Sequence, residues 1–239
     1  MAQMFKFPME YLRVTQGEND NYSHAGSLAM DFGGKDTGVD RLYCPCDMVV
    51  KRCRYNANGE LYLESTLPVL FADGTTDYAR LLCMHDNAFN VVEGQVLKQG
   101  DYFYDEGGMG GGKPGKYANH VHIEAGKGKW KSTTQTMNSR GSYVIEKQAH
   151  LYDLFILGDD VIIKGNGGYN WKKVSDFKEP ELEKECEHCK ELEAEVEKLA
   201  ENVAYLTTEL TQAKVDTAKL IEENRLLNGI LDEIENLVE

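Results

Sequence analysis

The sequence predicts a mainly β fold, in which an antiparallel β-sheet body precedes one long C-terminal α-helix that forms a coiled coil. Residues 1–178 contain short apolar runs, rich in Val, Tyr, Phe and Thr, that are separated by Gly, Asn and Asp. Residues 179–239 hold 18 acidic and 6 basic residues, so an acidic tail follows a nearly neutral body. We therefore expect two domains, 1–178 and 179–239.

The overall composition excludes several classes of function. The 239 residues include 26 Lys and Arg against 40 Asp and Glu, a net charge of −14, which disfavours binding to nucleic acid or to an anionic membrane. No apolar run approaches the ~20 residues of a membrane span, and residues 1–12 lack the apolar segment of a signal peptide. Six cysteines are too few for a disulfide scaffold. We expect synthesis in a reducing cytoplasm and neither nucleic acid nor membrane as a partner.

The tail carries a heptad repeat. With Leu182 at position a, 14 of the 17 a and d positions are apolar or Cys, a pattern that predicts a coiled coil. Val at a with Leu at d, together with Asn224 at a, favours two parallel strands. We expect a parallel homodimer through residues 181–238. The alternative is a solitary helix, which gains little stability from helix propensity alone.

Two cysteines lie at the start of this repeat. Cys186 and Cys189 share one helix face, so in a dimer they could form a four-Cys zinc site or inter-chain disulfides. The simpler interpretation, which we favour, is that Cys189 fills an a position.

The apolar runs of the body place its strands. We expect strands at 48–50, 61–63, 69–71, 79–84, 90–92 and 120–123, and a hairpin that joins 154–157 to 161–163. A glycine-rich segment, 107–115, has the spacing of a phosphate-binding loop. Because Pro114 stands where Ser or Thr would hold magnesium, and no helix follows, we exclude that function.

The segment His120-Val121-His122-Ile123-Glu124 carries the strongest chemical signal. Alternate residues of a strand face the same side, so the two histidines and the glutamate share one face. Two His and one carboxylate can hold zinc and leave its fourth position open, as catalytic zinc sites do. The alternative is a polar patch that binds no metal.

Several segments in this order resemble the lysostaphin-like (LytM-type) zinc endopeptidases of peptidoglycan. They are 23–26 with 29–32, 43–50, 84–86, 92–96 and 120–124. The resemblance covers about residues 11–125 and leaves 126–178 as an uncharacterised β extension. It implies that the glycine-rich segment forms the rim of a groove.

The resemblance also implies roles for individual residues. His24, Asp31 and His122 would hold Zn²⁺, while His85 and His120 would act on the attacking water and the developing oxyanion. Six residues separate His24 from Asp31, where the family usually has three; the lysin domains of some phage tail proteins look similar in this respect. The nearest rival to Asp31 is Asp36. Glu124 would support a ligand histidine.

These expectations combine into a function. We expect a zinc-dependent endopeptidase that cuts the peptides of bacterial peptidoglycan, of phage endolysin or tail-lysin type. It would be made in the cytoplasm of a phage-infected bacterium and act on the cell wall or travel with the virion. The alternative is a non-catalytic wall-binding or virion structural module with a degenerate peptidase fold.

Overall fold

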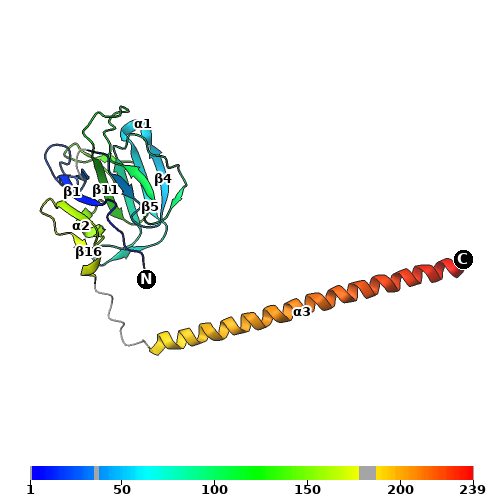
Figure 1. Cartoon of the computed structure of the whole chain (residues 1–239). Coiled ribbons are helices and arrows are strands. Elements are labelled where there is room, and N and C mark those ends of the chain that lie inside the picture. The colour runs from blue at the N-terminus through cyan, green and yellow to red at the C-terminus, as the bar shows by residue number, and fades with distance from the viewer. Residues whose placement is uncertain (1, 35–37, 178–186, 239) are drawn as a thin grey trace. The chain divides into compact units, whose positions relative to one another are not determined.

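The chain divides into two units, Met1–Phe177 and Lys178–Glu239, in a computed structural model that describes residues 2–34, 38–177 and 187–238 (Figure 1). The first unit is mainly β, and the second contains the single helix α3 (Glu187–Val238). The predicted fold class, a mainly β body followed by a long C-terminal helix, is confirmed. Cys186 and the side chain of Cys189 lie outside the described residues.

An eight-stranded sheet forms the centre of the first unit, in the order β15-β1-β2-β11-β8-β5-β4-β9. Its strands, in this spatial order, are Ile162–Gly165, Tyr11–Gln16, Met30–Phe32, Val121–Lys127, Ala79–Met84, Glu60–Ser65, Met48–Arg54 and Val96–Leu97. Neighbouring strands are antiparallel as expected, except that β15 joins β1 in parallel.

Eight short strands pair outside this sheet. They are β3 (Arg41–Tyr43) with β10 (Tyr102–Asp105), β6 (Val69–Leu70) with β7 (Thr76–Asp77), β12 (Thr136–Met137) with β13 (Tyr143–Val144), and β14 (Ile156–Leu157) with β16 (Lys172–Lys173). The short helices of this unit are α1 (Tyr55–Asn58), α2 (Leu151–Leu154) and the 3₁₀ helix η1 (Val174–Asp176).

Two expected strand features are wrong. Residues 154–157 and 161–163 do not form a hairpin, because Ile156 exchanges backbone hydrogen bonds with Phe5 and Phe7 and β14 pairs with β16. The following strand, β15, pairs with β1 instead. Residues 90–92 are not a strand, since Val92 accepts a hydrogen bond from Gln95 N in a turn.

Side-chain alternation along the central strands separates two faces of the sheet. Val121, Ile123 and Ala125 of β11 enter the main apolar core, whereas His122 and Glu124 point to the opposite face. That second face is covered in part by residues after β11. Trp130 and Ile145 pack there in a small cluster with Tyr62, Leu82 and Met84. The polar side chains of β11 are therefore buried.

The main core is closed by aromatic side chains from both ends of the first unit. Phe5 stacks on Phe155 with ring centroids 4.6 Å apart, and Phe7 meets Trp171 edge to face at 5.8 Å. Each of these four side chains is at most 8% exposed. The segment that the sequence marks as an uncharacterised extension therefore completes the core of the body.

No helix in the described part of the chain combines the length and the apolar character that crossing a bilayer requires.

A glycine at the end of α1 allows a close backbone approach that we can test. Gly59 has φ 63°, and a Cβ atom there would lie 2.2 Å from the carbonyl oxygen of Asp86. Gly74 has φ 82°, but its added Cβ would meet nothing within 4 Å. We predict that Gly74→Ala lowers the free energy of unfolding by about 1 kcal/mol, the cost of the left-handed backbone. Gly59→Ala should cost roughly 3 kcal/mol, because the clash adds to that strain.

Urea unfolding followed by tryptophan fluorescence measures both variants. An equal decrease in the free energy of unfolding for Gly59→Ala and Gly74→Ala would contradict the prediction.

Candidate metal centre and its cleft

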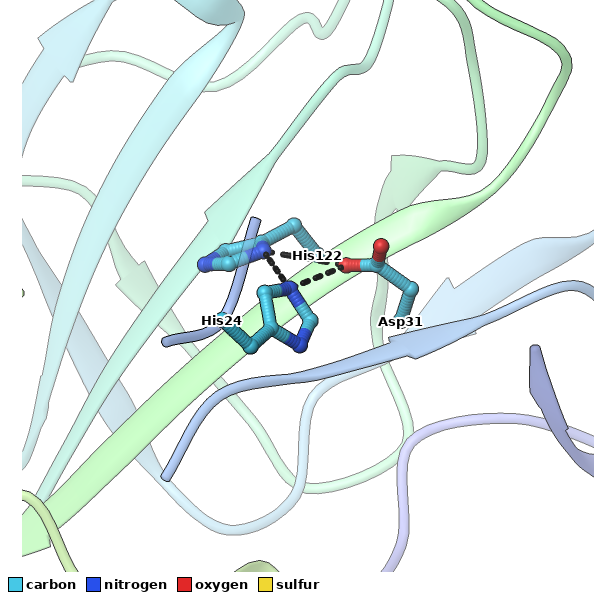
Figure 2. Close-up of side chains that lie close together, drawn as sticks. All are labelled: His24, Asp31 and His122. Atoms are coloured by element: carbon cyan, nitrogen blue, oxygen red, sulfur yellow. Dashed lines mark hydrogen bonds and ion pairs between the residues drawn. The ribbon is translucent and has the colours of Figure 1, made fainter. Parts of the chain in front are cut away.

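Three polar side chains from separate parts of the first unit converge on one point (Figure 2). Asp31 lies on β2 and His122 on the neighbouring β11, where the two residues are paired across the sheet. His24 lies in the turn between β1 and β2, not on a strand. These are the residues for which the sequence predicts metal binding. Asp36, the rival to Asp31, lies outside the described residues.

The turn that carries His24 is held by hydrogen bonds from a distant segment. Asn138 Nδ2 donates to the carbonyl oxygens of Ala25 and Gly26, each at 3.0 Å, and Ser142 Oγ donates to Ala25 O at 2.9 Å. Residues 138–142 therefore fix the position of an imidazole that the strands of the sheet do not carry.

The three converging atoms form a nearly equilateral triangle. His24 Nε2 is 3.1 Å from His122 Nδ1 and 3.2 Å from Asp31 Oδ1, and His122 Nδ1 is 2.9 Å from Asp31 Oδ1. Ligands at about 2 Å from a tetrahedral ion lie roughly 3.3 Å from one another. The observed separations fit a divalent metal ion bound by two imidazoles and one carboxylate.

The remaining ring nitrogens fix the orientation of both imidazoles. His24 Nδ1 donates to the carbonyl oxygen of Gly17 at 2.9 Å, which leaves a lone pair on Nε2. His122 Nε2 lies 3.3 Å from Glu124 Oε1, so the neutral ring donates there and keeps its lone pair on Nδ1. Partners of this kind commonly orient metal-binding histidines.

The electrostatics of the group favour a charged carboxylate beside a cation. Burial opposes a charge on His122, but the hydrogen bonds with Asp31 and Glu124 outweigh it and raise the pKa of His122 to about 10. Burial likewise opposes the charge on Asp31, and the hydrogen bonds with His122 and His24 outweigh it and hold the pKa of Asp31 well below its usual range. A divalent metal ion would meet the same electrostatic requirement.

Glu124 is fully buried, and four partners satisfy its carboxylate. Besides His122, it accepts hydrogen bonds from the backbone N of Ile145 at 2.7 Å, from Gln148 Nε2 at 2.6 Å and from Gln135 Nε2. A buried carboxylate is costly unless it is hydrogen-bonded in this way. Residues 135–148 therefore stabilise the group that orients His122.

Two further imidazoles lie beside the triangle. The rings of His85 and His120 are 4.5 Å apart, and His120 Nε2 is 3.9 Å from Asp31 Oδ2. His85 Nδ1 donates to Met109 O at 2.8 Å, and His120 Nδ1 donates to Ala118 O at 2.7 Å. In the neutral form each ring therefore carries a lone pair on Nε2, ready to accept a proton.

His85 is held in an unusual state. Its backbone has φ 92°, a left-handed conformation that a residue with a side chain rarely adopts and that often marks a functional position. Burial, followed by the neighbouring imidazoles of His122 and His120, lowers the pKa of His85 to about 3. The ring is therefore neutral at physiological pH.

The glycine-rich segment supports these two histidines. Gly107 exchanges two backbone hydrogen bonds with His120, at 3.0 and 3.1 Å. A Cβ atom on Gly107 would lie 2.4 Å from the carbonyl oxygen of His85, so only glycine fits between the two histidine backbones.

All five side chains line a cleft of about 1190 Å³. Arg13 of β1 lines it as well, as do Asn58 of α1 and Tyr117, which precedes β11. A space of this size exceeds the common range of small-molecule pockets. The cleft is therefore large enough for an extended peptide.

Some supporting groups could not be predicted from the sequence. The carbonyl oxygens of Gly17, Met109 and Ala118 give no side-chain signal, and Gln135 and Gln148 lie in the segment that matched no motif. Cys44 and Cys46 are buried in the main core and lie apart from this site.

Comparisons with known proteins relate the chain to a bacteriophage protein. Morphogenesis protein 1 of Bacillus phage B103 is 33% identical over 173 residues, which make up 71% of this chain and 44% of that protein. The chain therefore spans less than half the length of this relative. No protein-family model matches the chain.

Solved structures with a similar arrangement include two peptidases. One is a zinc-containing peptidase from Vibrio cholerae, with 21% identity and a TM-score of 0.37 over 52% of this chain and 37% of that one. The other is the catalytic domain of the antimicrobial peptidase lysostaphin from Staphylococcus simulans, with 18% identity and a TM-score of 0.35 over 48% and 79%.

The role of Glu124 in metal binding can be tested by removing its charge. We predict that Glu124→Gln lowers the affinity for a divalent metal ion by about 10- to 100-fold, because a neutral amide replaces the charged carboxylate that orients His122. Metal titration followed by calorimetry measures this affinity. The control is Glu64→Gln, which alters a buried carboxylate that accepts from the backbone N of Trp130. Similar affinity losses in both variants would contradict the assigned role.

Proposed function

We propose that this chain is a zinc-dependent endopeptidase that hydrolyses peptide bonds of bacterial peptidoglycan. The observation that carries the proposal is the triangle of His24 Nε2, Asp31 Oδ1 and His122 Nδ1, with sides of 2.9–3.2 Å, beside two further imidazoles in one cleft. Two His and one carboxylate with an open fourth position are typical of catalytic zinc.

The residues of the cleft have complementary chemical roles in this proposal. Bound zinc would lower the pKa of a water ligand and polarise a substrate carbonyl. His85, neutral at physiological pH, accepts a proton from the attacking water at Nε2 and later delivers it to the leaving amine. In its protonated form, His120 donates from Nε2 to the developing oxyanion.

The bacterial cell wall is proposed as the substrate for two reasons. The sequence motifs of residues 11–125 resemble those of lysostaphin-like peptidases of peptidoglycan, and the relative described above comes from a bacteriophage of Bacillus. In this proposal the protein acts on the wall either as a free lysin or as part of the virion.

A second candidate function is a structural role in the virion, with a peptidase fold that does not catalyse. The name of the relative, Morphogenesis protein 1, favours this alternative. The presence of both additional imidazoles, one in a strained backbone conformation, favours the enzyme, since a structural module has no need of either.

Zinc binding can be tested apart from catalysis. We predict that Zn²⁺ at about 100 times its dissociation constant stabilises the folded protein by roughly 2.7 kcal/mol, seen as a higher Tm of the body. His24→Ala and His122→Ala should abolish the shift. The matched control is His150→Ala, because His150 pairs with Glu18 and belongs to a different cluster. A full shift in the His122 variant would refute the ligand assignment.

Catalysis can be tested with variants that keep the metal ligands. We predict that His85→Ala and His120→Ala retain the zinc-dependent rise in Tm but lose about 10²- to 10⁴-fold in activity. The assay is release of peptide fragments from purified cell walls, identified by mass spectrometry, with a chelator and with zinc added back. Zinc binding by the unaltered chain without hydrolysis would instead support the structural alternative.

A further inference from the structure

Helix α3 presents to solvent a long apolar stripe, which only the polar residues Thr217 and Asn224 interrupt between 196 and 227. Every described side chain from Glu195 to Ile230 is exposed. Large apolar residues with exposures of 56–65% recur at the a and d positions of the heptad, namely Val196, Leu199, Val203, Leu206, Leu210, Leu220 and Leu227. An apolar stripe of this length needs a partner to leave water.

We propose that α3 pairs in parallel and in register with α3 of a second copy of this chain. The stripe has the 3.5-residue period of a two-stranded coiled coil, in which each a or d side chain packs between four residues of the facing helix. A second copy supplies an identical stripe of the same length. The charges beside the stripe and the polar residues within it select the orientation.

Four of the six g residues that border the stripe between 195 and 230 are acidic, whereas none of the five e residues is. Between 195 and 230 the g residues are Glu195, Asn202, Glu209, Asp216, Glu223 and Ile230, and the e residues are Ala200, Thr207, Lys214, Ile221 and Asn228. A parallel pair sets each g residue against the e residue five positions later in the partner. No two acids then meet, and Glu209 faces Lys214.

The antiparallel arrangement is unfavourable at these same positions. When the stripes from Val196 to Leu227 overlap fully in opposite directions, g residues face g residues and e residues face e residues. Glu209 then lies opposite Asp216, and Lys214 lies opposite the uncharged Thr207. The two acidic side chains repel each other, and symmetry repeats this pair once.

Asn224 gives an independent reason for the parallel orientation. At an a position of a parallel pair in register, Asn224 meets its own copy, and the two side-chain amides can hydrogen-bond across the stripe. In the antiparallel arrangement it would face Leu199 and lose that partner. A buried amide without a hydrogen bond is costly. The parallel pair also joins both N-terminal units to the same end of the coiled coil.

Analytical ultracentrifugation of the full chain tests the pairing without reference to activity. We expect a dimer at micromolar concentration. Leu227→Lys at a d position should weaken the dimer by at least about 100-fold, because it places two charges in the stripe. Leu226→Lys is the matched control, since the two leucines are 58% and 61% exposed but Leu226 lies at a c position. A monomeric or trimeric full chain, or equal effects of the two substitutions, would overturn the proposal.

Charge reversal tests the orientation. In the parallel pair, Glu209→Lys sets two lysines together and should raise the dimer dissociation constant by roughly 3- to 10-fold at low salt. Adding Lys214→Glu to the same chain should restore the original value, since opposite charges meet again. In the antiparallel pair, Glu209→Lys would tighten the dimer by pairing with Asp216. A lower dissociation constant for the single variant therefore overturns the parallel assignment.

Discussion

The first unit depends on one interaction, a buried carboxylate held between two imidazoles. A carboxylate in a protein interior costs several kcal/mol unless a cation or hydrogen bonds compensate it. Asp31 is only 7% exposed and lies within 3.2 Å of a nitrogen of both His24 and His122. The neighbouring strands β2 and β11 bring two of these groups into register, and the turn before β2 brings the third. The arrangement satisfies the carboxylate only while all three elements stay in place.

The segment after β11 makes this arrangement possible. Residues 135–148 hydrogen-bond Glu124, which orients His122, and also hold the turn of His24. Trp130 and Ile145 cover the sheet face on which these polar groups lie. Phe155 and Trp171 close the opposite face. Without the residues after β11, the carboxylate of Glu124 would lose its hydrogen-bond donors and its face of the sheet would be exposed. This segment therefore supports both the core and the site.

The cleft contains local strain that the rest of the body supports. His85 keeps a left-handed backbone because its N donates to Asn58 O and its carbonyl oxygen accepts from Met109 N. Gly107 leaves room for that carbonyl oxygen. Strain of this kind costs of order 1–3 kcal/mol and persists when the surrounding structure fixes the residue. In the proposed peptidase it sets the imidazole of His85 next to that of His120, where proton transfer is needed.

The sequence alone determined the division into a β body and an acidic helix. The alternation of polar and apolar residues that predicts the strands, and the seven-residue repeat that predicts the helix, are both local patterns in the sequence. The same alternation placed His122 and Glu124 on one face of β11. The motifs also singled out His24, Asp31 and His122 as a group. The predicted hairpin over 154–163 is wrong because its two strands pair with β16 and β1 instead, and the predicted strand at 90–92 is wrong because a local turn with Gln95 replaces it.

Only the tertiary structure decided which backbone and side-chain atoms contact the histidines and carboxylates of the site. The carbonyl oxygens that orient His24, His85 and His120 belong to the backbone, which every residue has, so no residue type reveals them. The role of residues 135–148 was likewise hidden, because glutamine and serine become informative only when folding sets them beside a buried carboxylate or a turn. Spacing along the chain can suggest a set of ligands, but separations near 3 Å between residues 24, 31 and 122 arise from strand pairing and turn geometry.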